Sequence, residues 1–300
     1  MHKNKKNFPL VSVIMNCHNG EKYLKQSIES LISQTYTNWE LIFWDNGSKD
    51  RSKQIFKSFK DTRLKYFFNK EKTTLYKARN LGIYQASGEF LTFLDTDDFW
   101  INDRLKKQLD YFTKFPDIHF IYGNYYIYNE KLNSQKIAYK NSLKSGKIYN
   151  FLLENYNVGL VSICLKKKIL IKFDERFDII GDFDSIMKLS KIYDFGFINE
   201  PLSYYRFHEN NFSLLNKDKH YNELSIWYNE NIKNNNKITI DIKKKFEIQI
   251  DELKIISLIL SKNKIKALEL IFKKVLLLKK IKFIIFLISS IKILKKFINR

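Results

Sequence analysis

The sequence predicts an α/β fold, with a mainly parallel sheet flanked by helices and followed by a helical C-terminal region. Strand-like and helix-like segments alternate through the first half of the 300 residues, and apolar residues make up 44% of the chain. Only 3 prolines and 9 glycines interrupt these segments. Such alternation is typical of right-handed βαβ units. We divide the chain into a domain at residues 1–215 and a basic, apolar helical region at residues 216–300.

The first half contains four predicted strands and four predicted helices. The strands are β-branched or aromatic runs at residues 10–15, 39–44, 63–68 and 89–94. The helices show apolar residues at helical spacing over residues 21–34, 49–59, 76–86 and 102–115. Ser48 is positioned to cap the second helix.

The second half is more mixed. Residues 118–128, 161–165 and 195–198 are strand-like, whereas residues 148–156 and 182–193 show helical spacing. From residue 215 the chain becomes rich in Asn and Lys, and it is then expected to be helical to its end, with a break near residues 279–282.

Basic residues dominate the charge, with 53 Lys and Arg against 32 Asp and Glu, a formal net charge of +21. Twelve of these bases, with only one acid, lie in residues 261–300. A basic and apolar helical region favours contact with an anionic membrane face. The alternative is a helical tail that packs on its own domain and keeps a solvated basic face.

The sequence lacks the signals of a secreted or membrane-spanning chain. The apolar residues 10–15 are too short for a signal-peptide core, and no run of about 18 apolar residues suggests a spanning helix. Two cysteines cannot form a disulfide framework, which fits a reducing compartment. We therefore expect a cytoplasmic protein, peripheral on the inner face of the cell membrane.

Polar residues follow three of the predicted strands, at residues 16–19, 45–46 and 95–98. In parallel sheets, ligands bind beyond the carboxyl ends of the strands. The third segment holds Asp95, Asp97 and Asp98, whose charges repel unless a cation joins them. Oxygen ligands alone favour Mg²⁺ or Mn²⁺, which typically shares its shell with substrate phosphates. The alternative is a solvated loop that caps the next helix.

Ordered motifs over some ninety residues carry a family resemblance. They are VSVIMNCHNGEKYL at 11–24, SLISQTY at 30–36, WELIFWDNGSKD at 39–50, ARNLG at 78–82, ASGEF at 86–90 and LDTDD at 94–98. The chain resembles the family 2 glycosyltransferases, inverting enzymes of the GT-A fold that use nucleotide-sugar donors. The resemblance weakens towards residue 213 and stops before the C-terminal region.

The resemblance implies roles for individual residues. Residues 16–19 are expected to line the nucleotide base and ribose, and Asp45 to accept a hydrogen bond from the base. The family usually has a second acid where this chain has Asn46. The complete set expected to bind the donor is Asn16, His18, Asn19, Asp45, Arg79, Asp95 and Arg206. The residues expected to hold the Mg²⁺ or Mn²⁺ ion are Asp97, Asp98 and His208, with Asp97 as the favoured ligand.

An inverting transfer also needs a carboxylate that takes the proton of the acceptor hydroxyl. The segment at 181–184, GDFD, resembles the family's catalytic motif, which commonly reads Glu-Asp-x-Asp. Gly181 stands in place of the Glu, so Asp182 is the candidate base, and Asp184 is expected to be structural or to face the acceptor. The alternative makes both acids ordinary helix N-terminal residues that favour the macrodipole.

The leading hypothesis is a metal-dependent hexosyltransferase that moves a sugar from a UDP-sugar to a saccharide or lipid-linked saccharide in envelope polysaccharide or lipopolysaccharide assembly. A nucleotidyltransferase is a second hypothesis, but it predicts a glycine-rich loop after the first strand, where only Gly20 is present. A non-catalytic, basic membrane-surface module is a third, and the intact carboxylates oppose it. The expected partners are the donor, the acceptor and an anionic membrane, and no nucleic acid.

Overall fold

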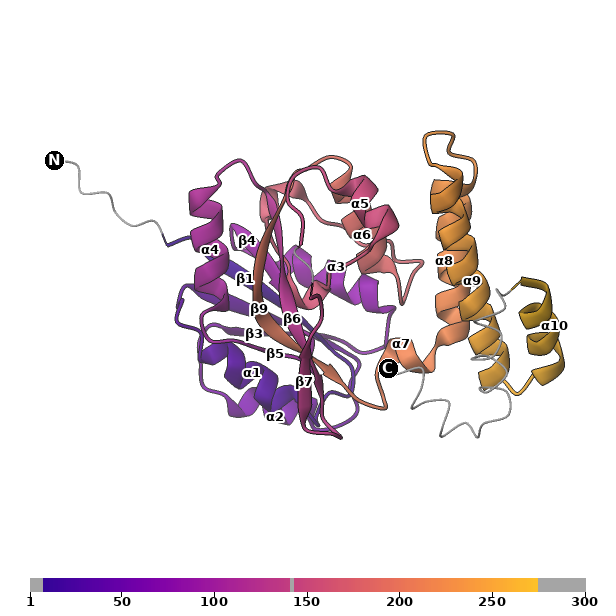
Figure 1. Ribbon diagram of the computed structural model, residues 1–300. Coiled ribbons are helices and arrows are strands. Elements are labelled where there is room, and N and C mark those ends of the chain that lie inside the picture. Colours follow the sequence, from indigo (N-terminus) through magenta and orange to yellow (C-terminus); the bar gives the residue numbers. More distant parts are fainter. Residues whose placement is uncertain (1–7, 141–142, 275–300) are drawn as a thin grey trace. The chain divides into compact units, whose positions relative to one another are not determined.

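The computed structural model describes residues 8–140 and 143–274, which belong to two compact units that divide between His208 and Glu209 (Figure 1). The first unit is an α/β domain and the second is helical. The predicted fold class, a mainly parallel sheet flanked by helices with a helical region after it, is confirmed.

The described part of the first unit is built on a nine-stranded sheet of order β3-β2-β1-β4-β8-β6-β9-β5, with β7 paired to β6. Its parallel half contains β1 (Val11–Cys17), β2 (Trp39–Asn46), β3 (Leu64–Asn69) and β4 (Phe90–Phe93). Its mixed half contains β5 (Phe99–Trp100), β6 (Phe120–Asn129), β7 (Ser134–Ile137), β8 (Cys164–Lys166) and β9 (Phe195–Phe207). The first four strands match the prediction, whereas β5 and β7 were not predicted and β9 extends nine residues beyond its predicted end.

Helices cover both faces of this sheet. Alternate residues of β1 pack against α1 (Leu24–Ile32), α2 (Ser52–Ser58) and α4 (Arg104–Lys114). The other face carries α3 (Leu75–Gln85), whose Gly82 lies so close to Ile14 of β1 that an added Cβ would meet its methyl group at 3.0 Å. Helices α5 (Tyr149–Glu154) and α6 (Gly181–Ser190) lie on the opposite side from α1 and α2 (Figure 1). Short 3-10 turns span Leu160–Ser162 and Lys167–Ile169.

The prediction that Ser48 caps the second helix is wrong. Helix α2 begins at Ser52, and its first turn is fixed instead by Asp50, whose Oδ1 accepts the Ser52 backbone N–H at 3.0 Å. The Ser48 hydroxyl accepts the backbone N–H of Asn19 at 3.0 Å. It therefore ties the loop after β1 to the loop after β2.

The second unit contains α7 (Phe212–Leu215), α8 (Lys217–Tyr228), a π-helical turn (Asn229–Lys233), α9 (Ile240–Leu260) and α10 (Lys264–Lys274). Helices α9 and α10 pack through a small apolar core of Ile255, Ile259, Ala267 and Ile271. No helix in the described residues has the length and apolar character needed to cross a bilayer. The helix break expected near residues 279–282 lies outside the described residues.

Glu40 is a buried ionic link in the parallel half of the sheet. Its carboxylate accepts hydrogen bonds from the Ser12 hydroxyl, from the Ser87 backbone N–H at 2.6 Å and from the Lys65 ammonium at 2.5 Å. Burial opposes its ionisation, but these hydrogen bonds and the Lys65 charge hold the pKa of Glu40 below its usual value. The ionised carboxylate thus stabilises the first three strands.

We expect Glu40→Gln to lower the free energy of unfolding at neutral pH by about 2 kcal/mol, because charge-assisted hydrogen bonds to Ser87 and Lys65 are weakened. Since the folded-state pKa is depressed, this contribution is present above the unfolded-state pKa and is lost as pH falls through the folded-state pKa. Urea unfolding of both proteins at several pH values checks this. A stability difference that does not shrink at acid pH contradicts it.

Candidate active site

The polar segments predicted at the strand ends meet at one edge of the sheet. Strand β1 lies between β2 and β4, with Cys17 beside Asp45 in the register. The loop that holds Asp95, Asp97 and Asp98, which we call the acidic loop, follows β4 directly. At its start the Leu94 backbone N–H donates to the Ile14 carbonyl at 3.1 Å. The carboxyl ends of these strands therefore bring the predicted donor-binding and acidic residues together.

The loops after β1 and β2 are joined by side-chain hydrogen bonds. His18 Nδ1 lies 3.0 Å from the Asn46 carbonyl oxygen, and Asn19 Oδ1 accepts the Lys49 backbone N–H at 2.8 Å. Asn19 has a φ of 56°, the left-handed region that asparagine tolerates better than most residues. The buried amide of Asn16 has no hydrogen-bond partner among the described residues, so it retains its capacity to bind.

Asp45 lines a pocket of about 270 Å³ together with Ser48, Lys49, Lys53 and Tyr66. Its Oδ1 accepts the Ser48 backbone N–H at 2.8 Å and its Oδ2 accepts the Tyr66 hydroxyl at 2.6 Å. Each carboxylate oxygen can accept a second hydrogen bond. The predicted bond from a nucleotide base therefore remains chemically open.

The hydrogen bonds of Asn46 explain why an amide stands where the family usually has an acid. Its Oδ1 accepts the Thr73 backbone N–H at 3.0 Å, and its Nδ2 donates to the Thr73 carbonyl at 3.0 Å. An ionised aspartate could accept the first bond but could not donate the second. The amide thus fixes the loop that leads into α3.

Helix α3 connects two carboxylates that are far apart in sequence. Arg79 is buried and donates from Nη2 to Asp95 Oδ1 at 2.7 Å. Burial opposes its charge, but Asp95, Tyr76 and Asp182 raise the pKa of Arg79 above its usual value. One turn earlier, the Tyr76 hydroxyl lies 2.9 Å from Asp182 Oδ1 and 3.0 Å from the Ile179 carbonyl, and its one proton serves one acceptor at a time. The candidate base and the acidic loop therefore lie on the same side of the domain.

The acids of the acidic loop differ in environment. Asp98 is 2% exposed, and its Oδ1 accepts the Arg206 backbone N–H at 2.8 Å, which ties the loop to β9. Burial, followed by the charges of Asp97 and Asp95, raises the pKa of Asp98 well above its usual value. The Asp97 side chain is 31% exposed, and its Oδ2 lies 3.0 Å from His208 Nε2. Asp97 is therefore the acid better placed to bind an ion, and the ligand role of Asp98 stays a prediction.

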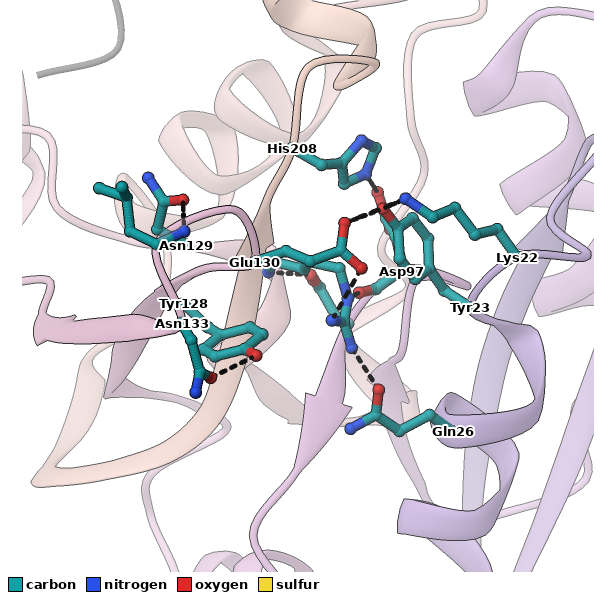
Figure 2. Close-up of polar contacts among 12 residues, drawn as sticks. Lys22, Tyr23, Gln26, Asp97, Tyr128, Asn129, Glu130, Asn133 and His208 are labelled. Atoms are coloured by element: carbon teal, nitrogen blue, oxygen red, sulfur yellow. Dashed lines mark hydrogen bonds and ion pairs between the residues drawn. The ribbon is translucent and has the colours of Figure 1, made fainter.

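Arg206 joins the acidic loop to α1. Figure 2 labels two residues that accept its hydrogen bonds, Asp97 of the loop and Gln26 of α1. Its guanidinium is buried, donates to the Asp97 carbonyl at 2.8 Å and to Gln26 Oε1 at 2.5 Å, and lies 4.6 Å from the centre of the Tyr23 ring. Glu130 closes the network by accepting the Tyr23 hydroxyl at 2.6 Å. The predicted contact with donor phosphate stays a prediction, and the observed contacts make Arg206 a structural link.

Asp97 and His208 fit a divalent ion whose shell is shared with substrate. No group of three or more His, Cys, Asp or Glu side chains able to hold an ion occurs in residues 8–140 and 143–274. Mg²⁺ usually binds through one or two carboxylates, several waters and substrate phosphates, so a complete protein cage is not required. Asp97 supplies the one carboxylate that such a site needs, and the His208 imidazole lies beside it.

Asp182 lies in the first turn of α6, where its Oδ1 also accepts the Phe183 backbone N–H at 2.9 Å. Burial raises the pKa of Asp182, whereas the Arg79 charge and the Tyr76 hydrogen bond partly offset that effect. A carboxylate with a raised pKa is a better proton acceptor. Asp184, in contrast, is buried, and its Oδ2 lies 2.6 Å from Lys188 Nζ. These contacts indicate a structural role for Asp184.

Tyr76 is the site residue that the sequence interpretation missed. A Cβ added at Gly181 would lie 2.4 Å from the Tyr76 ring. The aromatic ring thus occupies the space that a side chain at position 181 would need, which explains locally why Gly181 replaces the family's Glu. In the sequence, the only signal of this contact was Gly181 in place of the family's Glu. That signal did not identify Tyr76 as the residue that packs against it.

We expect Tyr76→Phe to move the acid limb of the pH profile of kcat/KM to higher pH. The variant keeps the ring but removes a hydrogen bond that lowers the pKa of Asp182, and the base is active only when ionised. A hydrogen bond to a charged group is worth about 1.5–3 kcal/mol, so kcat/KM should fall about tenfold on the acid side. An unchanged limb with a uniform loss of rate would indicate a structural role only.

The mainly parallel sheet flanked by helices, with polar residues gathered at the carboxyl ends of β1, β2 and β4, is the GT-A type of fold. The family model described as "Glycosyl transferase family 2" matches residues 12–174. The chain therefore belongs to glycosyl transferase family 2.

Relatives and solved structures agree with this assignment. The Escherichia coli UDP-Glc:alpha-D-GlcNAc-diphosphoundecaprenol beta-1,3-glucosyltransferase WfgD is 36% identical over 185 residues, 62% of this chain and 70% of that protein. An uncharacterized glycosyltransferase of Methanocaldococcus jannaschii, MJ1057, is 31% identical over 234 residues, 74% of this chain and 81% of that protein. The S. aureus TarS 1-349 structure in complex with UDP-GlcNAc superposes with a TM-score of 0.61 at 17% identity, covering 80% of this chain and 71% of that one.

Proposed function

We propose that this glycosyltransferase moves a hexose from a UDP-sugar to a hydroxyl of a diphosphate-linked GlcNAc lipid in envelope polysaccharide assembly, with inversion at the anomeric carbon. The observation that carries the proposal is the link between Asp182 and Asp95 of the acidic loop, which contact Tyr76 and Arg79 of the same helix, α3. The activity for which the E. coli relative WfgD is named supports the choice of donor and acceptor.

In the proposed reaction, Asp182 accepts the proton of the acceptor hydroxyl as its oxygen forms a bond to the anomeric carbon. The bond between that carbon and the UDP oxygen breaks on the opposite face, which inverts the configuration. Asp97 and His208 would hold Mg²⁺ or Mn²⁺, which offsets charge on the leaving diphosphate. Arg79 keeps Asp95 oriented beside this site.

Transfer from UDP-glucose to a synthetic, short-chain α-GlcNAc-diphosphate lipid tests the proposal. We expect turnover with Mn²⁺ or Mg²⁺, loss of turnover with EDTA, and a β-linked product by NMR. GDP-glucose and dTDP-glucose serve as matched donors. GDP-glucose differs from UDP-glucose in the base alone, and dTDP-glucose differs in the base and in the sugar of the nucleoside. An α-linked product, or preference for another nucleotide, would overturn the corresponding part of the proposal.

We also propose that α10 binds the anionic, cytosolic face of the membrane. Ile265 is 75% exposed and Phe272 is 60% exposed, and both lie on the helix face away from the buried Ala267 and Ile271. The same helix carries Lys264, Lys266, Lys273 and Lys274. Exposed apolar residues among lysines are typical of helices that lie in the interface of anionic lipids.

We expect Ile265→Ser with Phe272→Ser to weaken binding to phosphatidylglycerol vesicles at least tenfold, because each apolar side chain contributes roughly 1.5–3 kcal/mol when buried. Ile240→Ser is the control, since Ile240 of α9 is similarly exposed but lies outside α10. Vesicle sedimentation measures the effect. Equal binding to phosphatidylcholine vesicles would contradict the role of charge.

A further inference from the structure

Four tyrosines come from separate segments, and one of them packs on the residue that follows the candidate base. We call these four residues the tyrosine cluster. They are Tyr125 of β6, Tyr139 after β7, Tyr156 after α5 and Tyr205 of β9. The Tyr125 ring meets the Tyr139 ring edge to face at 5.8 Å and the Tyr205 ring at 6.5 Å. The proposed reaction, as described above, leaves these side chains without a role.

The cluster adjoins Asp182 through its neighbour in sequence. The Tyr156 ring packs edge to face on Phe183 at 4.8 Å, and Phe183 directly follows Asp182. Burial, followed by the charge of Asp182, raises the pKa of Tyr156 well above its usual value. The Tyr156 hydroxyl oxygen is buried and has no hydrogen-bond partner among the described residues. Such an unpaired polar group destabilises the fold unless a ligand or water satisfies it.

The surrounding chain holds the rings in place. A Cβ added at Gly159 would lie 2.6 Å from the Tyr125 ring, so only glycine leaves room for that ring. The buried Asn124 donates to the Tyr139 carbonyl at 2.7 Å and accepts the Tyr139 backbone N–H at 3.2 Å. The rings are therefore fixed before any ligand binds, which lowers the entropy lost on binding.

The hydroxyls of the cluster remain hydrogen-bond donors at neutral pH. Burial raises the pKa of Tyr125 well above its usual value, and the neighbouring Tyr139, Tyr205 and Asp98 raise it further. A tyrosine offers an apolar ring and a polar tip, which suits a pyranose that has C–H faces and hydroxyl edges. Tyr125, Tyr139 and Tyr205 are each only partly buried, so part of each residue remains accessible to solvent.

We propose that the tyrosine cluster is the subsite for the acceptor saccharide, where the rings flank the pyranose that carries the attacking hydroxyl and the phenol groups bind its other hydroxyls. The inference rests on the proposed function and adds to it the residues that select the acceptor. It places the acceptor sugar beside Asp182, which must take the proton of the attacking hydroxyl.

Tyr125→Phe and Tyr156→Phe test the subsite without altering ring packing. We expect each variant to raise the KM of the synthetic α-GlcNAc-diphosphate lipid about tenfold, because a hydroxyl-binding site loses a hydrogen bond. The KM of UDP-glucose and its slow hydrolysis without acceptor should stay unchanged. Tyr149→Phe is the matched control, since its hydroxyl is also buried and without a partner among the described residues, and burial alone raises its pKa.

Ligand-observed NMR of the acceptor analogue in the presence of UDP gives a second readout that does not need turnover. Weaker binding in both cluster variants and not in Tyr149→Phe supports the subsite. Unchanged acceptor KM and binding in both cluster variants overturns it and leaves the proposed function standing. If the wild-type protein hydrolyses UDP-glucose but neither binds nor glycosylates the analogue, the proposed acceptor and the subsite both fail, while the donor assignment survives.

Discussion

Asp182→Asn is expected to lower kcat for sugar transfer by about 10³-fold, within the range that a positioned general base contributes. The amide keeps the shape of the side chain and can still accept the Tyr76 hydroxyl proton and the Phe183 backbone N–H. It cannot take the proton of the acceptor hydroxyl. Steady-state kinetics with saturating donor and acceptor measure the loss, and the KM of the donor should change little.

Asp184→Asn is the control for this variant because it alters a second acid on the same helix. Asp184 is buried and bonded to Lys188, so Asp184→Asn should lower the melting temperature of the protein. Its kcat should stay close to that of the wild type. A result in which Asp184→Asn abolishes turnover while Asp182→Asn retains it would reverse the assignment of the base. Comparable melting temperatures of Asp182→Asn and the wild type would exclude unfolding as the cause of its inactivity.

The parallel half of the sheet could be predicted because its signals are local. Strands β1, β2 and β4 are fully buried runs of mainly apolar residues, and helices of regular spacing follow them. The mixed half could not be predicted as well, because its strands depend on distant partners. Strand β7 is fully exposed, and β5 has only two residues held by pairing with β9. The full length of β9 follows from its pairing with β6, which local propensity does not encode.

Some residues of the candidate site could be predicted from the sequence, and others could not. The loop of Asp95, Asp97 and Asp98 and the helix that carries Asp182 could be predicted from local motifs and from the family resemblance, whereas the role of Asp182 as the base stays a prediction. Tyr76 and the contact of Gly181 with its ring could not be predicted, because they depend on the packing of α3 against α6. The burial of Arg206 under Tyr23 and Glu130 likewise arises from tertiary contacts between segments more than seventy residues apart.

Asp97→Asn is expected to raise the Mn²⁺ concentration needed for half-maximal activity at least tenfold and to lower kcat/KM by about 10²-fold. The reason is the loss of the partly exposed carboxylate beside His208. The ion proposed to bind there would stabilise the charge that develops in the transition state by several kcal/mol. Metal titration at fixed donor concentration measures the first effect. Asp61→Asn is the matched control, since Asp61 pairs with Arg63 before β3, outside the site.

Asp98→Ala separates ion binding from support of the loop. Asp98 is buried and accepts the Arg206 backbone N–H, so a variant that removes this acceptor should lower the melting temperature and leave the metal requirement close to that of the wild type. The two neighbouring acids then give opposite signatures, one in metal affinity and one in stability. If Asp98→Ala instead raised the metal requirement as much as Asp97→Asn did, Asp98 would have to turn towards the ion during catalysis, and the loop would have to release β9 to allow it.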